Sequence, residues 1–403
     1  MKVLISAYAC EPDKGSEPEA GYRTLLAAAS QHEVWLLTRD NNVAPLHAAL
    51  RSSPFRERIH IVGLDLGRTS RLIKRWGSPG LHTYYRRWQR AAGEAALDLH
   101  HEIQFDIAHH VTFASFWTSI GVGALSVPLV IGPIGGAVST PLRLLPSLGM
   151  RGTLEELVRI VARALGARNG DVRMTLRAAR VVLVQNAETA KRIGRTDDAL
   201  VLPNALAVDP TGSSPAARRT NEIAFVGRLI PWKAPILAVR ALRDLADSDV
   251  SLHIYGEGPQ RRRLERAARR WGIADRMKFE GHMERFRLRE RIAGSAVLIH
   301  PAVHEEAGFA VAEALAAGTP VVCLDHGGPA ELVRRWPHVP SRALAPQSPG
   351  RMSRSLAAAV VSLRDRKRSA GKTISPAVDF REAILGAYLR AVADPRPGSA
   401  QGS

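Results

Sequence analysis

Two carboxylates, Glu305 and Glu313, lie between two short apolar runs of the sequence. The runs, Val297–His300 and Val321–Leu324, have the composition of buried strands. In an open parallel sheet, ligands bind beyond the carboxyl ends of the strands, and Glu305 follows such an end. Gly308 lies where the next helix is expected to begin, and the free N–H groups of a helix start suit a diphosphate.

Acidic residues near a helix start also complement the helix dipole without any function. That reading accounts for Glu305 and for its neighbour Glu306. It does not account for Glu313, which falls inside a small and apolar helical segment, because carboxylates are rarely buried without a partner. We therefore expect Glu313 to accept hydrogen bonds from a ligand, such as the hydroxyls of a ribose.

Two cations flank a second turn, which follows the apolar run Ile223–Val226. Gly227 allows a sharp turn at the end of that strand. Arg228 presents a planar fork of donors and Lys233 a compact charge, and both geometries suit a pyrophosphate. Taken alone, the two cations read as solvated surface charges. Together with the carboxylate segment, they predict a site for a diphosphate ligand.

Composition limits the class of protein. The chain has 403 residues, 45% of them hydrophobic, which is enough for two domains with separate cores. No apolar run approaches the roughly 18 residues of a membrane span, and the strand-like start Lys2–Ala7 does not read as a signal peptide. The two cysteines, Cys10 and Cys323, do not form a disulfide framework, which fits the cytoplasm. The net charge of +18 attracts phosphate groups, and Arg-rich composition alone would also produce it.

Short β-branched runs alternate with helical patterns along the whole chain, which predicts α/β architecture with parallel sheets. The expected strands are Val3–Ala7, Val34–Thr38, Ile59–Leu64, Ile107–Val111, Leu129–Gly132, Val181–Gln185, Ile223–Val226, Leu252–Tyr255, Met277–Phe279, Val297–His300 and Val321–Leu324.

The alternation falters between Asn204 and Asn221, in a stretch rich in turn-forming residues. We therefore expect one domain over residues 1–204 and a second over 205–377, with a further amphipathic helix over 378–393. The tail 394–403 is rich in Pro, Gly and Ser and is expected to be disordered. Thr153 and Glu156 have the spacing of a capping box, which predicts a helix start there.

The ordered set of motifs resembles the retaining GT-B glycosyltransferases of the family 4 type, in a bacterial branch. That family has a Gly-Arg-Leu…Lys segment followed by a Glu-x7-Glu segment, as at Gly227–Lys233 and Glu305–Glu313 here. The resemblance covers nearly the whole chain. Its other matches are Val201–Asn204, Tyr255–Pro259, Asp325–Pro329 with Glu331, the opening Ile5–Pro18, and Gly132–Gly136.

The resemblance implies two doubly wound Rossmann-like domains that face a cleft, with the C-terminal helix crossing back to the first domain. It implies a nucleotide diphosphate sugar donor in the second domain and a saccharide or lipid-linked acceptor in the first. Arg228 and Lys233 would stabilise the leaving diphosphate, Glu305 would contact the donor sugar, and Glu313 would hold the ribose. Gly15, Gly227, Gly256, Gly308 and Phe309 would complete the donor site, with no metal and no cofactor.

The sequence departs from the family pattern at two places near this site. Glu305-Glu-Ala-Gly-Phe309 replaces the commoner Glu-Gly-Phe-Gly, so the loop that faces the sugar differs. Ala234 stands where a glycine usually follows the lysine. Neither departure removes a charged group.

A histidine pair, His109 and His110, ends the strand from Ile107. Relatives often place a histidine here that faces the donor sugar. Because strand side chains alternate between faces, only one of the two can do so. We assign His110 to the catalytic set on its resemblance to the bacterial branch. The alternative is that both rings contact only the protein.

The segment from Arg68 to Arg90 interleaves cations with Trp76, Tyr84, Tyr85 and Trp88. This pattern suits an anionic membrane surface, single-stranded nucleic acid, or a surface helix whose aromatic residues lie in the core. Basic residues recur between residues 143 and 180. We expect a peripheral protein on the inner face of the plasma membrane, with a role in envelope or exopolysaccharide synthesis, and no nucleic-acid partner.

Two other classes fit part of the pattern. One is a non-catalytic protein that binds a nucleotide sugar or nucleic acid, and the other is a nucleotide-sugar epimerase. Donor hydrolysis distinguishes an enzyme from the first class. An epimerase would turn over donor in the absence of acceptor.

The cations predict that turnover needs no metal. Arg228 and Lys233 supply the positive charge that a metal would give the leaving group. Asp247 and Asp249 resemble a metal-binding pair but precede the strand Leu252–Tyr255, at the end of the sheet where ligands do not bind. Activity should therefore survive a chelator. Loss on chelation and recovery with Mn²⁺ or Mg²⁺ would contradict this.

Overall fold

The computed structural model describes most of the chain. The described residues are 1–12, 14, 16–67, 77–207, 219–246, 249–364 and 376–393. Gly15, Asp247, residues 68–76 of the basic segment, most of the expected linker and the tail 394–403 lie outside them. The predictions made for those residues therefore stay predictions.

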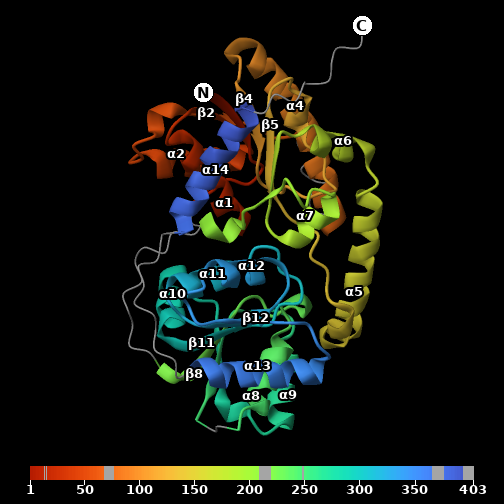
Figure 1. Ribbon diagram of the computed structural model, residues 1–403, viewed down its shortest axis with the longest axis vertical. Coiled ribbons are helices and arrows are strands. Elements are labelled where there is room, and N and C mark those ends of the chain that lie inside the picture. The colour runs from red at the N-terminus through yellow and green to blue at the C-terminus, as the bar shows by residue number, and fades with distance from the viewer. Residues whose placement is uncertain are drawn as a thin grey trace. The chain divides into compact units, whose positions relative to one another are not determined.

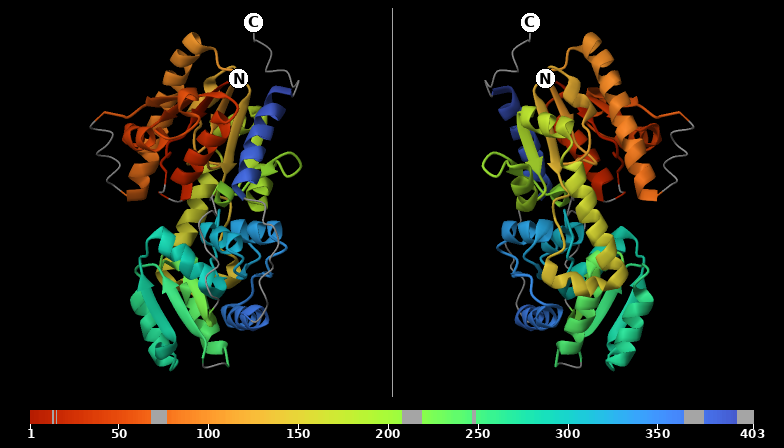
Figure 2. Two further views of the ribbon diagram at one scale, coloured as in Figure 1. Left: turned by 90° about the vertical axis from the view of Figure 1, so that its left-hand side faces the viewer. Right: turned by 90° about the vertical axis from the view of Figure 1, so that its right-hand side faces the viewer.

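Two compact units divide the chain, as Figure 1 shows. The first unit comprises Met1–Ala137, Ala162–Ala207 and Ala377–Ser403, and the second comprises Val138–Val161 and Val208–Pro376. Each unit has one parallel sheet, and helices cover both faces of each sheet (Figures 1 and 2).

The sheet of the first unit has seven strands in the order β3-β2-β1-β4-β5-β6-β7. The strands are β1 (Lys2–Ser6), β2 (Glu33–Thr38), β3 (Ile59–Gly63), β4 (Ile107–His110), β5 (Leu129–Ile134), β6 (Val181–Val184) and β7 (Leu200–Val201). The helices are α1 (Ser16–Ala29), α2 (Asp40–Leu50), α4 (Gly77–Ile103), α6 (Gly170–Ala178), α7 (Ala187–Ile193) and α14 (Pro376–Ala393), with short turns η1 (Arg56–Arg58), η2 (Gly121–Ala124) and η4 (Asn204–Ala207).

The sheet of the second unit has six strands in the order β10-β9-β8-β11-β12-β13. The strands are β8 (Arg219–Val226), β9 (Ser251–Tyr255), β10 (Met277–Gly281), β11 (Ser295–His300), β12 (Val321–Leu324) and β13 (Arg342–Leu344). The helices are α8 (Pro235–Asp244), α9 (Arg261–Arg270), α10 (Arg285–Gly294), α11 (Phe309–Ala316), α12 (Gly327–Arg335) and α13 (Pro349–Arg364), with short turns η3 (Leu142–Leu144), η5 (Pro231–Lys233) and η6 (Ala274–Arg276).

Burial explains why the apolar runs form these strands. Every residue of β4, β6, β11 and β12 is buried, so both faces of the central strands are covered by helices. All the strands predicted from sequence are present, and the doubly wound α/β fold is confirmed. The short strands β7 and β13 were not predicted. They lie at the sheet edges, where incomplete burial weakens the apolar signal.

The expected domain boundary differs from the division of the structure at one segment. Residues 138–161, which we placed in the first domain, belong to the second unit. Leu144 and Leu148 lie fully buried in the second unit's core. The ring of His326 hydrogen-bonds to the carbonyl oxygen of Ser139, at 2.8 Å. Residues 138–161 therefore belong to the second unit because they pack against it, although they precede the expected domain boundary in the sequence.

The predicted helix start at Thr153 is wrong. Helix α5 (Leu145–Gly166) already includes this residue, and it is interrupted at Gly149, which has φ 75°. The hydroxyl of Thr153 donates to the carbonyl of Leu145 at 3.1 Å instead of capping a helix. Glu156 accepts a hydrogen bond from the backbone N–H of Thr140. Glu156 therefore binds the backbone of the neighbouring segment at Thr140 and does not complete a capping box.

Helix α14 packs in the first unit, where Phe380, Ile384 and Tyr388 are buried. The hydroxyl of Tyr388 lies 2.9 Å from Nδ1 of His109, at the end of β4. The C-terminal segment and the centre of the first sheet are thus joined by a buried polar contact.

The aromatic residues of the basic segment lie in the core of the first unit. Tyr84, Tyr85 and Trp88 are at most 1% exposed, and Tyr8 contacts all three rings. In the described part of this segment, the pattern is therefore a surface helix with buried aromatic residues, and these three rings cannot form a membrane patch. Within the described ranges, no helix combines the length and the apolar character needed to cross a membrane.

Ala234 has a backbone conformation that favours glycine, the residue that the family resemblance led us to expect there. It adopts the left-handed conformation, with φ 45° and ψ 45°, between η5 and α8. That conformation costs a non-glycine residue about 1–2 kcal/mol. Lys233 directly precedes this residue, so the strained turn lies in the same segment as one of the predicted phosphate-binding cations.

We predict opposite effects for two buried alanines changed to glycine. Ala234→Gly should leave stability unchanged or raise it by up to about 1 kcal/mol, because relief of strain exceeds the entropy cost of glycine. Ala238→Gly, inside α8, should cost about 1 kcal/mol or more. Urea unfolding of the two variants measures the difference. Equal destabilisation would show that residue 234 is not left-handed.

Candidate functional site

The carboxyl edge of the second sheet gathers the predicted residues of that unit. Strands β8 and β11 are neighbours at the centre of the sheet, and β9 and β12 flank them. Because all four are parallel, the loops that follow them emerge at one edge. Gly227 and Arg228 follow β8, Gly256 follows β9, and Glu305 lies in the loop after β11.

Backbone contacts lock the loops after β8 and β9 together. The N–H of Gly227 donates to the carbonyl of Tyr255 at 3.0 Å, and that of Leu229 donates to Glu257 at 2.8 Å. Both Gly227 (φ 148°) and Gly256 (φ 141°) adopt conformations that other residues avoid. A Cβ atom on Gly256 would lie only 2.1 Å from the carbonyl oxygen of Gly227. Gly256 therefore has a structural reason to be glycine, apart from any ligand.

A shared carbonyl brings Lys233 against Glu305. The carbonyl of Trp232 accepts hydrogen bonds from the backbone N–H groups of Val303, at 2.9 Å, and His304, at 3.3 Å. The ammonium group of Lys233 then donates to Oε2 of Glu305 and forms an ion pair with it. The Lys233 side chain is 20% exposed and that of Glu305 14%, so the pair is largely removed from water.

Glu305 also occupies the start of helix α11. Its Oε1 accepts a hydrogen bond from the backbone N–H of Gly308, at 3.4 Å. Gly308 precedes the helix with φ 78°, and Phe309 is the first helical residue. The carboxylate thus lies at the N-terminus of α11, where the helix dipole favours negative charge.

The loop after β12 supports Glu305 from its backbone side. The N–H of Gly328 donates to the carbonyl of Glu305 at 3.1 Å. A Cβ atom on Gly327 would lie 2.3 Å from the same carbonyl oxygen, and one on Gly328 would lie 2.2 Å from that of Glu306. The predicted glycine pair at 327–328 therefore permits close packing of the two loops.

Charge and burial set the protonation of the site. Burial of the Lys233 ammonium group, together with the nearby charge of Arg228, lowers its pKa from 10.5 to about 8. Arg228 is exposed and forms no ion pair with any residue that the structure describes. This group of three side chains therefore contains two cations, Arg228 and Lys233, and one carboxylate, that of Glu305.

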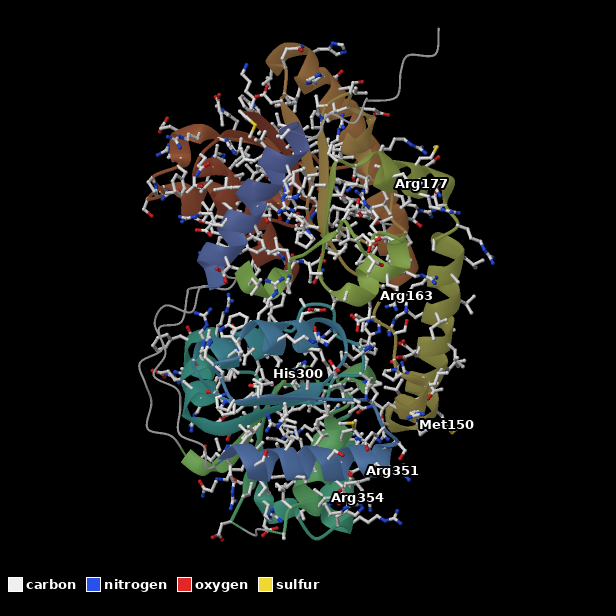
Figure 3. All side chains as sticks on the ribbon, viewed as in Figure 1. Met150, Arg163, Arg177, His300, Arg351 and Arg354 are labelled. Atoms are coloured by element: carbon white, nitrogen blue, oxygen red, sulfur yellow. The ribbon has the colours of Figure 1, made fainter. Side chains whose placement is uncertain are left out.

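His300 is a member of the site that we did not predict. It ends β11 (Figure 3). It is 3% exposed, and neither ring nitrogen has a hydrogen-bond partner within the described chain. Its Nε2 lies 3.5 Å from Oε2 of Glu305. Burial, together with the charge of Lys233, lowers its pKa to about 3, so the ring is neutral. The sequence did offer one sign of this role, because His300 is the last residue of an expected strand.

Glu313 has protein partners that the sequence did not reveal. Its Oε1 lies 3.2 Å from Nε of Arg285 and 3.5 Å from Nε of Arg289, both on α10. The Glu313 side chain is 9% exposed. We expected Glu313 to lack a structural explanation, and these ion pairs provide one. Arg285 and Arg289 are one helical turn apart, so both side chains lie on one face of α10. We overlooked this spacing, which could have indicated partners for a carboxylate.

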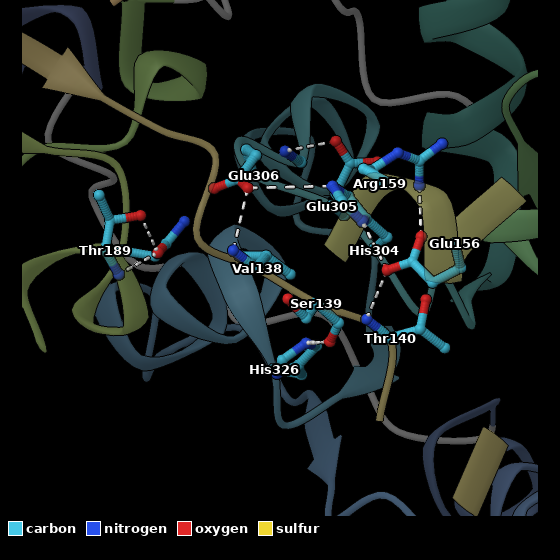
Figure 4. Close-up of polar contacts among 12 residues, drawn as sticks. Val138, Ser139, Thr140, Glu156, Arg159, Thr189, His304, Glu305, Glu306 and His326 are labelled. Atoms are coloured by element: carbon cyan, nitrogen blue, oxygen red, sulfur yellow. Dashed lines mark hydrogen bonds and ion pairs between the residues drawn. The ribbon is translucent and has the colours of Figure 1, made fainter. Parts of the chain in front are cut away.

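A charge network centred on α5 holds the loops that carry Lys233 and Glu305 (Figure 4). Glu156 on α5 is 1% exposed, forms an ion pair with Arg159 and lies 3.6 Å from Nδ1 of His304. Arg159 in turn stacks over the ring of Trp232, at 4.7 Å. Burial alone would raise the pKa of Glu156, but hydrogen bonds from His304 and Thr140 and the charge of Arg159 lower it to about 2.

The remaining predicted side chains lie in the first unit. Both ring nitrogens of His109 have hydrogen-bond partners. Its Nε2 lies 3.0 Å from the carbonyl oxygen of Gly132, and its Nδ1 lies 2.9 Å from the hydroxyl of Tyr388. His110 contacts the Tyr85 hydroxyl through Nε2, at 3.3 Å, while its Nδ1 has no partner among the described residues. Burial, together with the charge of His109, lowers the pKa of His110 to about 3. His110 thus keeps one unused nitrogen, and His109 does not.

This arrangement is chemically suited to an anion that reaches the edge of the sheet. Arg228 can donate a planar fork of hydrogen bonds, and Lys233 adds a compact charge. The N-terminus of α11 adds backbone donors. Among the described residues, no group of three or more His, Cys, Asp or Glu side chains has the arrangement of a metal site.

The second unit matches a known family. Residues 212–361 match the model of the glycosyl transferases group 1 family. The chain is 35% identical over 136 residues to the 2-deoxystreptamine glucosyltransferase of Streptomyces kanamyceticus, a match that covers 33% of this chain and 35% of that protein. It is 27% identical over 294 residues to the 2-deoxystreptamine N-acetyl-D-glucosaminyltransferase of Streptomyces fradiae, which covers 68% of each.

A solved structure matches along nearly the whole chain. Alr3699/HepE of Anabaena, crystallised in complex with UDP, superposes with a TM-score of 0.56 at 16% identity, over 97% of each chain. At this identity the likeness shows the fold alone. The chain therefore has the GT-B fold, and its residues 212–361 carry the sequence pattern of the glycosyl transferases group 1 family.

Proposed function

We propose that this protein is a retaining glycosyltransferase that moves a sugar from a nucleoside diphosphate sugar to a saccharide or lipid-linked acceptor. The observation that carries the proposal is the pairing of Lys233 with Glu305 beside the exposed cation Arg228, at the carboxyl edge of the second sheet. A diphosphate needs cations at that edge, and a sugar attached to it needs a polar contact nearby. The glycosyltransferase relatives support this reading.

The two cations act on the leaving group in this proposal. As the glycosidic bond breaks, negative charge grows on the departing diphosphate. Arg228 and Lys233 stabilise that charge without a metal ion. Glu305, released from Lys233 by the arriving diphosphate, contacts the donor sugar. The exchange replaces one anion beside Lys233 with another, so the largely buried cation never lacks a partner.

The transfer step proceeds on one face of the sugar. The bond between the anomeric carbon and the diphosphate oxygen breaks, and a bond from the acceptor hydroxyl oxygen forms on the same face. The acceptor proton passes to the departing phosphate oxygen. No protein nucleophile is needed, and the configuration of the anomeric carbon is retained.

Further contacts complete the proposed donor site. Glu313 exchanges part of its pairing with Arg285 and Arg289 for the hydroxyls of the ribose. Gly227, Gly256, Gly308 and Phe309 shape the loops around the diphosphate, and Gly15 approaches it from the first domain. His110 faces the donor sugar, consistent with its unused ring nitrogen.

The donor class is proposed from a solved structure of the same fold, and the cellular place from the composition of the chain. The solved relative from Anabaena holds UDP, which makes UDP-sugars the first donors to test. Cell-envelope or exopolysaccharide synthesis, in the cytoplasm and at the inner face of the membrane, would supply a lipid-linked or saccharide acceptor. The basic composition of the chain favours phosphate-bearing partners of this kind.

Removal of either cation should mainly reduce turnover. We expect Lys233→Ala and Arg228→Ala each to lower kcat by roughly 10²–10³, with smaller effects on donor binding, because their charges matter most in the transition state. The double variant should lose less than the product of the two factors, because both residues act on one diphosphate. Steady-state kinetics on variants with unchanged thermal unfolding measures this.

Lys278 provides a matched control on β10 of the same unit. Its side chain is exposed, and Lys278→Ala should leave turnover unchanged. If Lys233→Ala or Arg228→Ala keeps more than about a third of wild-type kcat, that residue does not stabilise the leaving diphosphate, since a fixed charge of this kind is worth far more.

The reduced pKa of Lys233 predicts a basic limit to activity. Lys233 acts as a cation, so kcat/KM should fall as the pH rises through the pKa of this group in the free enzyme. Burial places that pKa near 8, and the Glu305 carboxylate opposes the shift, so the fall should begin at or above pH 8.

The variant Lys233→Arg tests whether deprotonation of Lys233 causes the fall of kcat/KM at basic pH. A guanidinium stays charged throughout that range, so this variant should lose the basic fall even if its overall rate is lower. A wild-type profile that stays flat up to pH 10.5, the ordinary pKa of lysine, would show that Lys233 is not the titrating cation.

A further inference from the structure

Helix α5 turns its apolar side outward in the second unit. Leu154, Val158 and Val161 are 64%, 61% and 58% exposed, and Met150 is 93% exposed. These residues and Leu157 recur at helical spacing and form one stripe. In the part of the chain that the structure describes, no other helix exposes more than two large apolar side chains.

The opposite side of α5 is polar and is used by the protein. Glu156 is 1% exposed and holds Thr140 and Arg159, in the charge network centred on α5. Gly152 packs so closely that a Cβ atom there would lie 2.6 Å from Cβ of Pro231. The helix is therefore fixed by its polar side, and it cannot rotate to bury the apolar stripe without breaking this network.

Positive charge borders the stripe. The guanidinium group of Arg263, on α9, contacts the carbonyls of Ser147 and Leu148 at the start of α5, both at 3.4 Å. Helix α9 has the sequence RRRLERAARR, with six arginines and one glutamate. Arg351 and Arg354, on α13 of the same unit, are also exposed (Figure 3). An apolar strip with arginines at its border is the pattern of a helix that lies in a membrane interface.

We propose that the outer face of α5, formed by Met150, Leu154, Leu157, Val158 and Val161, inserts into the interface of an anionic lipid membrane. The stripe from Met150 to Val161 spans about 16 Å along the helix, so it lies in the plane of the membrane and does not cross it. The arginines of α9 then meet the anionic headgroups.

Charge distinguishes a lipid surface from a second copy of the chain. Two copies joined through this face would bring two arginine-rich α9 helices toward each other, and like charges oppose such contact. An anionic membrane neutralises the same charges. The proposal deepens the peripheral placement proposed above and does not depend on sugar transfer.

Vesicle binding by the full chain tests the proposal, without donor present. The wild type should sediment with vesicles of phosphatidylglycerol and phosphatidylcholine, less at high salt, and little with phosphatidylcholine alone. The triple variant Leu154→Gln, Leu157→Gln, Val158→Gln should bind the anionic vesicles roughly tenfold or more weakly, because apolar insertion is lost. Arg262→Gln with Arg266→Gln should reduce both the binding and its salt dependence.

A matched control lies on α14, where Leu389 is 64% exposed, as is Leu154, and Val392 is 51% exposed. Leu389→Gln with Val392→Gln should leave vesicle binding unchanged. Thermal unfolding checks that each variant is folded.

Three outcomes would overturn the proposal. They are wild-type protein that binds no vesicles or binds neutral ones equally, a triple variant that binds as the wild type does, and light scattering that shows a dimer abolished by the triple variant. Since no donor is present, any of them leaves the transferase proposal standing.

Discussion

The ion pair between Lys233 and Glu305 is the contact on which the candidate site depends. A largely buried ammonium group requires an anion, and in the free chain a carboxylate at the start of α11 supplies it. The surrounding structure brings these two side chains together from distant parts of the sequence. Close glycine contacts join the loops, the carbonyl of Trp232 anchors one loop to the other, and Glu156 fixes both from behind.

This pairing gives the proposed reaction a simple electrostatic course. The diphosphate of a donor replaces the Glu305 carboxylate beside Lys233, so the cation keeps an anionic neighbour throughout. Arg228, exposed and without an ion pair among the described residues, is available to meet the diphosphate first. The neutral ring of His300 lies beside the pair and adds no third positive charge to Arg228 and Lys233.

The sequence predicted the sheets well because their central strands are continuous apolar runs, and it predicted where the loops of the candidate site lie because they follow those strands. It failed where three-dimensional packing decides. Thr153 and Glu156 have the spacing of a capping box, but in the fold they contact Leu145 and Thr140 instead. The partners of Glu313 lie on another helix, and edge strands such as β7 and β13 are too short to show a pattern.

Calorimetric titration with UDP, which carries no sugar, tests the central claim most directly. If Glu305 competes with the diphosphate for Lys233, Glu305→Gln should bind UDP several-fold more tightly than the wild type. The neutral glutamine forms a weaker hydrogen bond with Lys233 than the carboxylate does, so the diphosphate displaces it more easily. Lys233→Ala should bind UDP more weakly. Unchanged affinity in both variants would contradict the account, because the pair would then lie outside the diphosphate site.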